Sequence, residues 1–204
     1  MHFHPLLRDY SVNKICLDTL PLTPWRNGAG QTREIVAYSQ SDSSESFSWR
    51  ASIATINQDC YFSLFPGVDR IITLLHGEGV TLTAPGWQQQ LKHGESFSFR
   101  GEEKIYARLQ GGISHDFNLM TCRKSHHASM STITHEVQPP SHVAGIAYVL
   151  TGGWQCQRNP LSQGECVWWH HNGPALIPVT PDACLLFATI EKRHPDSPKR
   201  PTSL

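Results

Sequence analysis

The architecture follows from one segment, Phe62-Ser-Leu-Phe-Pro-Gly-Val-Asp-Arg-Ile-Ile-Thr-Leu-Leu-His-Gly-Glu-Gly79. Its Pro66-Gly67 pair predicts a turn, because proline presets one turn position and glycine accepts positive φ at another. The apolar run Ile71–Leu75 has the length of a buried strand, and Gly77 and Gly79 predict a second turn directly after it. A strand that ends in a glycine-containing corner is typical of a small antiparallel barrel.

Strand patterns recur on both sides of this segment, whereas helical periodicity is almost absent. Residues 47–56 alternate, with Trp49 on an apolar face and Arg50, between Ser48 and Ser52, on the opposite face. Short strands at intervals of about 8–12 residues indicate a sandwich or barrel, so we expect an all-β fold. The other expected strands are Thr32–Tyr38, Val80–Thr83, Ser96–Phe99, Ile105–Leu109, Phe117–Thr121, Ser131–Val137, Gly145–Leu150, Gln163–Trp169, Ala175–Val179 and Ala183–Ile190.

The sequence contains a loose internal repeat. Ile71–Gly79 resembles Ile146–Trp154, since each is a strand that runs into a glycine turn and is followed by a Gly-Glu pair opening another strand. Such a repeat predicts two copies of one barrel, the second abbreviated. We therefore expect a first barrel over residues 5–125 and a smaller second barrel over residues 130–192.

Two polar segments flank the smaller barrel. The segment Cys122-Arg-Lys-Ser-His-His-Ala-Ser129 lacks apolar periodicity, and we expect it to cross between the barrels. Residues 193–204 contain three prolines and no aromatic residue, which predicts a disordered tail. Exchange of strands between the barrels would make the boundary near residue 125 approximate.

The bulk composition argues against several classes of partner. The 204 residues carry 17 basic and 17 acidic side chains, and no cluster of Lys or Arg precedes the C-terminal end, which argues against nucleic acid. No apolar run approaches the roughly 20 residues of a membrane-spanning helix. The first residues lack a signal-peptide pattern, and the six cysteines include no C-x-x-C pair, so we expect reduced thiols and a cytoplasmic protein.

The segment Pro24-Trp-Arg-Asn-Gly-Ala-Gly30 bears glycines but lacks the spacing of a phosphate-binding loop, and it leads into a strand. Asn27-Gly28 favours a tight turn with positive φ. Two interpretations stay open: a packed turn pinned by Trp25, or a lip over the mouth of the barrel. In the second, Trp25 forms an apolar wall and Asn27 supplies an amide donor and acceptor.

Several motifs together resemble a known family. The Leu-x-Gly-x-Gly turn ending at Gly79 and the later Gly94-Glu-Ser-Phe-Ser-Phe99 look like the cupin barrel. With a wider set of motifs the chain resembles the HutD/Ves family of bicupins, densely over residues 23–121 and more faintly to residue 190. These motifs are Pro24–Gly30 with Thr32 and Glu34, Trp49-Arg-Ala-Ser-Ile-Ala54, Phe62-Ser-Leu-Phe-Pro-Gly67, Arg70 and Asp116-Phe-Asn-Leu119.

The resemblance implies two stacked cupin barrels within one compact chain. HutD members are associated with histidine utilisation, as binders of a pathway intermediate of the formylglutamate type, and Ves members are described as stress-induced. The resemblance therefore implies a cytoplasmic binder of a small molecule, and it does not establish an enzyme.

The resemblance also bears on metal binding. Metal cupins converge His and Glu ligands on one divalent ion. Comparison with that pattern puts Arg70 near the position of the Glu ligand. It puts Leu64, Phe65 and Pro66 near the paired His positions. In the second cupin motif, Arg100 and Lys104 lie near the Pro and the His. Because cations in these places would repel an ion, we expect no metal and no cofactor.

Two arginines are the candidate anion-binding groups. Arg50 is either exposed on a polar strand face or directed into the barrel, and the family resemblance favours the second. Directed inward, its planar guanidinium suits a carboxylate in a bidentate contact, and Arg70 could supply a second positive charge. Asp116 and Asn118 share one face of their strand. Either Asp116 pairs with Arg50 and holds the shape of the site, or these polar groups contact a ligand directly.

The sequence thus predicts non-catalytic binding of a small carboxylate metabolite of the N-formylglutamate type, in histidine or other amino-acid utilisation or in a stress response. The alternative is a metal-independent isomerase or hydrolase, although the adjacent His115 and Asp116 face apart on a strand. A third hypothesis is an interaction protein with filled barrels, and Trp168-Trp169 with the strand edges allows a homodimer. Glu34 and Ser63 enter the site by resemblance alone. The predicted ligand-binding residues are Trp25, Asn27, Glu34, Arg50, Ser63, Arg70, Asp116 and Asn118.

Overall fold

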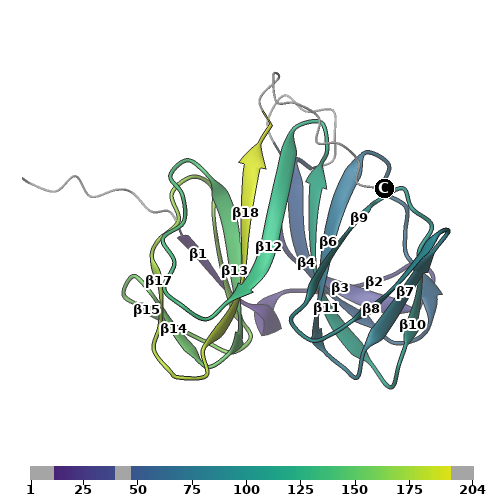
Figure 1. Ribbon diagram of the computed structural model, residues 1–204, viewed down its shortest axis with the longest axis horizontal. Helices are drawn as coiled ribbons and strands as arrows, with labels where there is room; N and C mark the ends of the chain where they lie inside the picture. The colour runs from purple at the N-terminus through teal and green to yellow at the C-terminus, as the bar shows by residue number, and fades with distance from the viewer. Residues whose placement is uncertain (1–11, 40–46, 194–204) are drawn as a thin grey trace, which may run out of the picture.

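The computed structural model describes residues 12–39 and 47–193, and these residues form 18 strands and one short 3-10 helix (Figure 1). All strand pairs of the four sheets are antiparallel, so the expected all-β fold is confirmed. The helix η1 covers only Leu17–Thr19, and no helix in the described ranges is long and apolar enough to cross a membrane. The expected tail lies outside the described residues from residue 194 onward.

The first half of the molecule consists of a six-stranded and a four-stranded sheet. In spatial order, the six-stranded sheet contains β2 (Leu22–Pro24), β3 (Gly30–Tyr38), β4 (Trp49–Ile56), β11 (Ser114–Cys122), β6 (Val68–His76) and β9 (Ser96–Arg100). The four-stranded sheet contains β5 (Cys60–Tyr61), β10 (Tyr106–Leu109), β7 (Val80–Ala84) and β8 (Trp87–Leu91).

The second half consists of a five-stranded and a three-stranded sheet. The five-stranded sheet contains β1 (Val12–Cys16), β16 (Glu165–Trp169), β13 (Ala144–Thr151), β18 (Cys184–Lys192) and β12 (His126–Ile133). The three-stranded sheet contains β15 (Asn159–Ser162), β14 (Gly153–Cys156) and β17 (Leu176–Pro178). None of the four sheets, as far as the described residues form them, closes into a barrel. Each half is instead a pair of facing sheets with an apolar core between them.

Strand alternation produces three cores in a four-layer stack. On β4, Trp49, Ala51 and Ile53 point into the core between the two large sheets, which joins the halves, while Ile56 points into the core of the first half. On β18, Leu186 and Ala188 likewise face the joint core. Both faces of each large sheet are therefore buried over much of their area, and Figure 1 shows these two sheets side by side in the middle of the molecule.

Two features of the chain path connect the two halves. The segment from residue 122 to 129 passes from the six-stranded sheet of the first half to the five-stranded sheet of the second, as expected, but only residues 123–125 form the connecting turn, and β12 begins at His126. The first strand, Val12–Cys16, pairs with β16 and extends the sheet of the second half, although it lies within the range expected for the first barrel. This strand has the half-exposed pattern of a sheet edge, so its sequence contains no apolar run from which the strand could be predicted.

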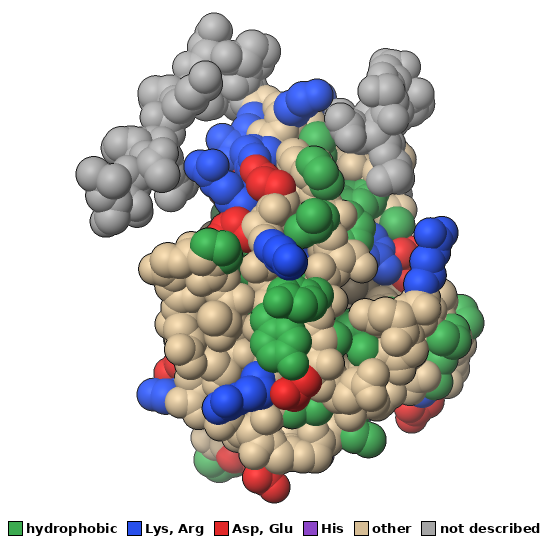
Figure 2. All heavy atoms as spheres, turned by 90° about the vertical axis from the view of Figure 1, so that its right-hand side faces the viewer, with side chains coloured by type: hydrophobic (Ala, Val, Ile, Leu, Met, Phe, Trp, Pro, Cys, Tyr) green, Lys and Arg blue, Asp and Glu red, His purple; other side chains and the backbone are tan. Residues whose placement is uncertain are grey.

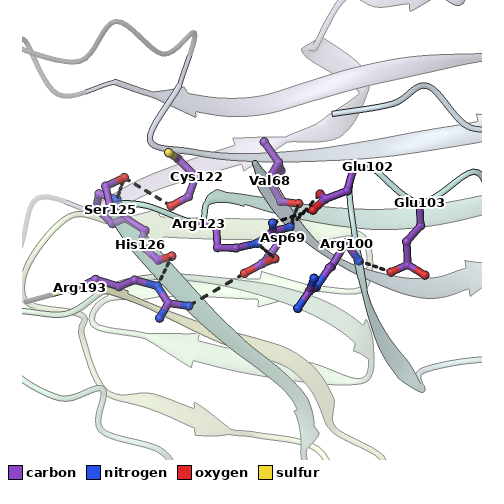
Figure 3. A network of polar contacts seen from close by, with 10 residues as sticks. All are labelled: Val68, Asp69, Arg100, Glu102, Glu103, Cys122, Arg123, Ser125, His126 and Arg193. Atoms are coloured by element: carbon purple, nitrogen blue, oxygen red, sulfur yellow. Dashed lines mark hydrogen bonds and ion pairs between the residues drawn. The ribbon is translucent and has the colours of Figure 1, made fainter. Parts of the chain in front are cut away.

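A polar network holds the end of β18 against the first half (Figure 3). Arg123, in the turn after β11, donates from Nε to Asp69 at 2.6 Å and from Nη1 and Nη2 to Glu102 at 2.7 and 2.8 Å. Arg193 donates to the His126 carbonyl at 3.3 Å and lies 4.0 Å from Asp69. The hydrogen bonds from Arg123 lower the pKa of Glu102 to about 2, and the same bonds raise the pKa of Arg123.

The outer face of the first half mixes hydrophobic and charged side chains. Figure 2 shows hydrophobic side chains exposed down the middle of this face, with basic and acidic ones beside them. Tyr61 and Leu64 are each 54% exposed, and Lys104 lies 4.9 Å from the centre of the Tyr61 ring. Side chains of both signs therefore occur on this face.

Candidate ligand-binding cleft

A cleft of about 570 Å³ lies on the inner face of the six-stranded sheet, beneath the chain from Pro21 to Asn27 and beside the segment from Phe62 to Phe65. Alternate residues of β3, β4 and β11 form its floor, because side chains two apart on a strand share one face. The residues around it are Pro21, Thr23, Pro24, Trp25, Arg26, Asn27, Thr32, Glu34, Arg50, Ser52, Ala54, Ile56, Phe62, Ser63, Phe65, Arg70, Asn118 and Met120.

The two arginines flank one methionine in a single cross-strand row. Met120 on β11 is paired with Arg50 on β4 and with Arg70 on β6. Strands in a sheet are about 4.8 Å apart, so the backbones that carry the two guanidinium groups are separated by roughly 10 Å. The register therefore brings two positive charges to one floor from positions 20 residues apart in the sequence.

Arg70 is a buried cation, with only 6% of the residue exposed. Its Nη2 donates to Asn118 Oδ1 at 2.8 Å, and its guanidinium carbon lies 4.9, 5.1 and 5.6 Å from the ring centres of Phe99, Phe62 and Phe65. Its Nε is buried without a hydrogen-bond partner, and no carboxylate of residues 12–39 and 47–193 forms an ion pair with it. Burial, and secondarily the charge of Arg50, lowers the pKa of Arg70 to about 9.

Arg50 is directed into the cleft, and it already has a partner. Its Nε donates to Glu34 Oε2 at 2.6 Å, and its Nη1 lies 3.9 Å from the sulfur of Met120. The Glu34 side chain is 50% exposed and that of Arg50 is 20% exposed. The pair therefore lies at the solvent-accessible side of the cleft, where an incoming carboxylate would compete with Glu34 for the guanidinium.

The lip of the cleft is a tight turn. Trp25 Nε1 donates to Thr32 Oγ1 at 2.7 Å, and Asn27 Oδ1 accepts the Ala29 N–H at 3.1 Å. Gly28 has φ 69°, in the region that favours glycine. The turn is thus packed by its own side chains, and it lines the cleft as well. With its oxygen used inside the turn, Asn27 retains its NH₂ group as a donor.

Asp116 does not line the cleft. It lies opposite Ala54 and Leu74, two residues along β11 from Asn118, and it is completely buried. Ser114 Oγ donates to its Oδ2 at 3.1 Å, while its Oδ1 has no hydrogen-bond partner in the described part of the chain. Burial raises the pKa of this carboxyl to about 7.

The Arg50–Asp116 pair considered from the sequence is therefore wrong. Arg50 lies opposite Met120, four residues along β11 from Asp116, and pairs with Glu34 on the neighbouring strand instead.

Seven of the eight predicted site residues border the cleft, and Asp116 is the exception. Other residues of the cleft were not predicted as site residues: Arg26, Ser52, Phe62, Phe65 and Met120. Three of these had a signal in the sequence, since Ser52 shares the strand face of Arg50 and both phenylalanines belong to the Phe62–Gly67 motif. Met120 could have been found by extending the alternation of Asp116 and Asn118 by two residues.

The residues of the cleft do not suit a metal ion. Among the residues that the structure describes, those of the cleft include no His or Cys, and their only carboxylate, Glu34, is paired with Arg50. In the described ranges, no group of three His, Cys, Asp or Glu side chains converges in a way that could hold a metal ion. Three arginines border the cleft (Arg26, Arg50 and Arg70), and their guanidinium groups favour an anion.

Comparison with known proteins assigns the family. The HutD family model matches residues 18–187 of the chain. Protein Ves of Cronobacter sakazakii is 38% identical over 173 residues, which cover 84% of this chain and 94% of that protein. The structure of HutD from Pseudomonas fluorescens SBW25 (formate condition) superposes with a TM-score of 0.79 at 26% identity, covering 90% of this chain and 100% of that one. A cupin 2 conserved barrel domain protein from Leptotrichia buccalis shares the fold at 9% identity, with a TM-score of 0.57 and coverage of 90% of this chain and 98% of that one. The chain is therefore a member of the HutD family.

Proposed function

We propose that the cleft binds a small carboxylate metabolite, of the N-formylglutamate type, without transforming it. The observation that carries the proposal is Arg70, a buried guanidinium with an unused Nε donor and no carboxylate partner among the described residues. A buried charge is costly unless it is paired, and a ligand carboxylate would supply the missing pair.

The surroundings of Arg70 support a carboxylate. A planar guanidinium makes bidentate contacts to a carboxylate, and such charge-assisted hydrogen bonds are stronger than neutral ones. Asn118 fixes the orientation of the guanidinium through its Oδ1, and the rings of Phe62 and Phe99 exclude water beside it. Arg50 and Arg26 could then meet a second acidic group, because both also border the cleft. A volume of about 570 Å³ is in the range of small-molecule sites.

The fold and the family suggest the biological setting. We propose that each pair of facing sheets is one cupin unit, so that the molecule is a bicupin with β1 exchanged into the second unit. We further propose a cytoplasmic role in histidine or other amino-acid utilisation or in a stress response, the settings that the resemblance to the HutD/Ves family implies.

Calorimetric titration tests the proposal. N-Formylglutamate, glutarate and the neutral analogue glutaramide are titrated into the wild type, Arg50→Ala and Arg108→Ala. Arg108 is a matched control, because it is an exposed arginine of β10 outside the cleft. We expect heat from the acids and none from glutaramide, weaker binding by Arg50→Ala, and no change by Arg108→Ala. Absence of heat from the wild type, or unchanged heat with Arg50→Ala, would remove the proposal.

Catalysis by the same protein has one supporting observation. The pKa of Asp116, about 7, would let this carboxyl accept or give a proton at neutral pH. The carboxyl does not border the cleft, so it lacks direct access to a ligand there. Following N-formylglutamate by proton NMR in the presence of the protein distinguishes the two functions, since any new signal that disappears with Asp116→Asn would favour the enzyme.

A further inference from the structure

A second cleft, of about 410 Å³, lies on the opposite face of the same sheet, where the two halves diverge. Alternation on β3 and β4 separates the two clefts: Thr32 and Glu34 point into the first, whereas Gln31, Arg33 and Thr55 point into the second. The second cleft is closed on its other side by η1 and by Tyr148 of β13. Figure 1 shows η1, a short purple helical turn, between the two halves.

Polar side chains cross the wall of this second cleft in one row. Thr55 on β4 is paired with Gln31 on β3 and with His115 on β11, and His115 is paired with His76 on β6. The ring centres of His76 and His115 are 5.7 Å apart. Four neighbouring strands thus place two imidazoles, an amide and a hydroxyl along one wall of the second cleft.

The charges around this row favour an anion. Arg33 donates from Nη1 to the Leu17 carbonyl at 2.8 Å and lies 3.4 Å from Asp18, whose side chain is 97% exposed. Within residues 12–39 and 47–193, Asp18 is the only carboxylate that borders the second cleft. Besides His115, the titratable and charged groups that border this cleft among the described residues are His76 from β6, Arg33 from β3, Asp18 from η1 and Tyr148 from β13. Burial, then His76 and Arg33, lowers the pKa of His115, as expected where positive charges accumulate without a partner.

We propose that the second cleft binds a small organic acid, with its carboxylate or phosphate head on Arg33, His76 and His115. Leu75 and Leu150 form apolar walls for the carbon part of the ligand. Each protonated imidazole donates a charge-assisted hydrogen bond, and the anion removes the repulsion between the two rings. Because the pKa of His115 is lowered from its ordinary value of 6.5, its imidazole is mostly neutral at pH 8, and binding strengthens as the pH falls and this imidazole gains its proton.

NMR of the histidine side chains tests this proposal. Benzoate and phenyl phosphate are titrated separately, with benzamide as the uncharged control. We expect a saturable shift of the His76 and His115 ring signals with a charged probe, stronger at pH 6 than at pH 8, and none with benzamide. The tighter of the two charged probes identifies the head group. If neither charged probe gives a saturable shift, the proposal is overturned.

Variants separate this site from an accidental pair of surface histidines. His76→Gln combined with His115→Gln should weaken binding of the tighter probe at least tenfold, followed on the signals of the neighbouring Tyr148 ring. His135→Gln, at an exposed position outside both clefts, should leave the affinity unchanged. Equal affinity in the double variant and the wild type would overturn the assignment. The readout lies on groups of the second cleft, so it is independent of whether the first cleft binds N-formylglutamate.

Discussion

Replacing Arg70 by methionine should stabilise the protein and weaken binding in the first cleft. In the folded state the pKa of Arg70 falls from 12.5 to about 9, because the charge is buried beside Arg50. One pKa unit corresponds to about 1.4 kcal/mol, so the charged form carries a cost on the order of 5 kcal/mol. Contacts with three aromatic rings and the hydrogen bond to Asn118 offset about 3 kcal/mol of it. We expect Arg70→Met to raise the unfolding free energy by about 1–2 kcal/mol.

The assay is urea denaturation with differential scanning calorimetry, run without ligand. For a chain of this size, the gain corresponds to an increase in Tm of about 2–8 °C. Arg108→Met is the matched control, because Arg108 is exposed and its replacement should change stability by less than about 0.5 kcal/mol. The advantage of Arg70→Met should also shrink above about pH 9, where wild-type Arg70 loses its proton and its burial no longer costs charge desolvation.

Binding measurements complete the test of Arg70. The same variant should bind N-formylglutamate at least tenfold more weakly, because it lacks the charge-assisted hydrogen bonds of the guanidinium. A loss of stability above about 1 kcal/mol would refute the reasoning, since it would mean that Arg70 is compensated within the folded protein. If the variant gained stability but kept the affinity of the wild type, the buried charge of Arg70 would have no part in ligand binding.

Three further predictions concern the described residues. The pKa of Asp116 is raised from 3.8 to about 7 on folding, so its contribution to the unfolding free energy is fully present below pH 3.8 and falls by up to about 4 kcal/mol as the pH rises toward 7. Urea denaturation at pH 4 and pH 8 should show this loss in the wild type and not in Asp116→Asn. Gly30→Ala should lower the unfolding free energy by about 1–3 kcal/mol and weaken ligand binding, because the new Cβ would collide with the Thr55 carbonyl oxygen and press on the Trp25 ring. Gly28→Ala should lower the unfolding free energy by about 1 kcal/mol through its positive φ alone, and equal losses of affinity in the two variants would contradict this. Arg123→Ala should lower the unfolding free energy by about 1 kcal/mol at low salt and by less at 1 M salt, as expected for a partly exposed network; a salt-independent loss would point to packing instead.

Much of the fold could be predicted from local patterns. The alternation of residues 47–56 placed Trp49 and Arg50 on opposite faces, and the structure has Trp49 in the joint core and Arg50 in the cleft. Edge strands were missed because their sequences do not alternate cleanly. The strand Trp87–Leu91 carries three consecutive glutamines, and Val12–Cys16 is half exposed.

Contacts between strands could not be predicted, because they depend on register. The bulge between Glu34 and Val36 changes the pairing of β3 with β4, and Arg50 pairs with Glu34 and not with Asp116. For the same reason, the second cleft could not be predicted from the sequence. His76 and His115 are 39 positions apart in the sequence, and only the pairing of β6 with β11 makes them neighbours.

The placement of β1 has a consequence for how the chain is made. Val12 is paired with Trp169. One of the earliest described segments to leave the ribosome therefore finds partners for its backbone N–H and C=O groups only after one of the later segments has been made. Contacts so distant along the chain slow folding and leave unpaired strand edges exposed meanwhile. A fragment starting at residue 126 would lack this edge strand and present β16 to solvent, which makes it prone to self-association. The two halves are thus linked by the pairing of β1 with β16, which joins distant parts of the chain. Expressing either half alone is a poor route to a smaller functional protein.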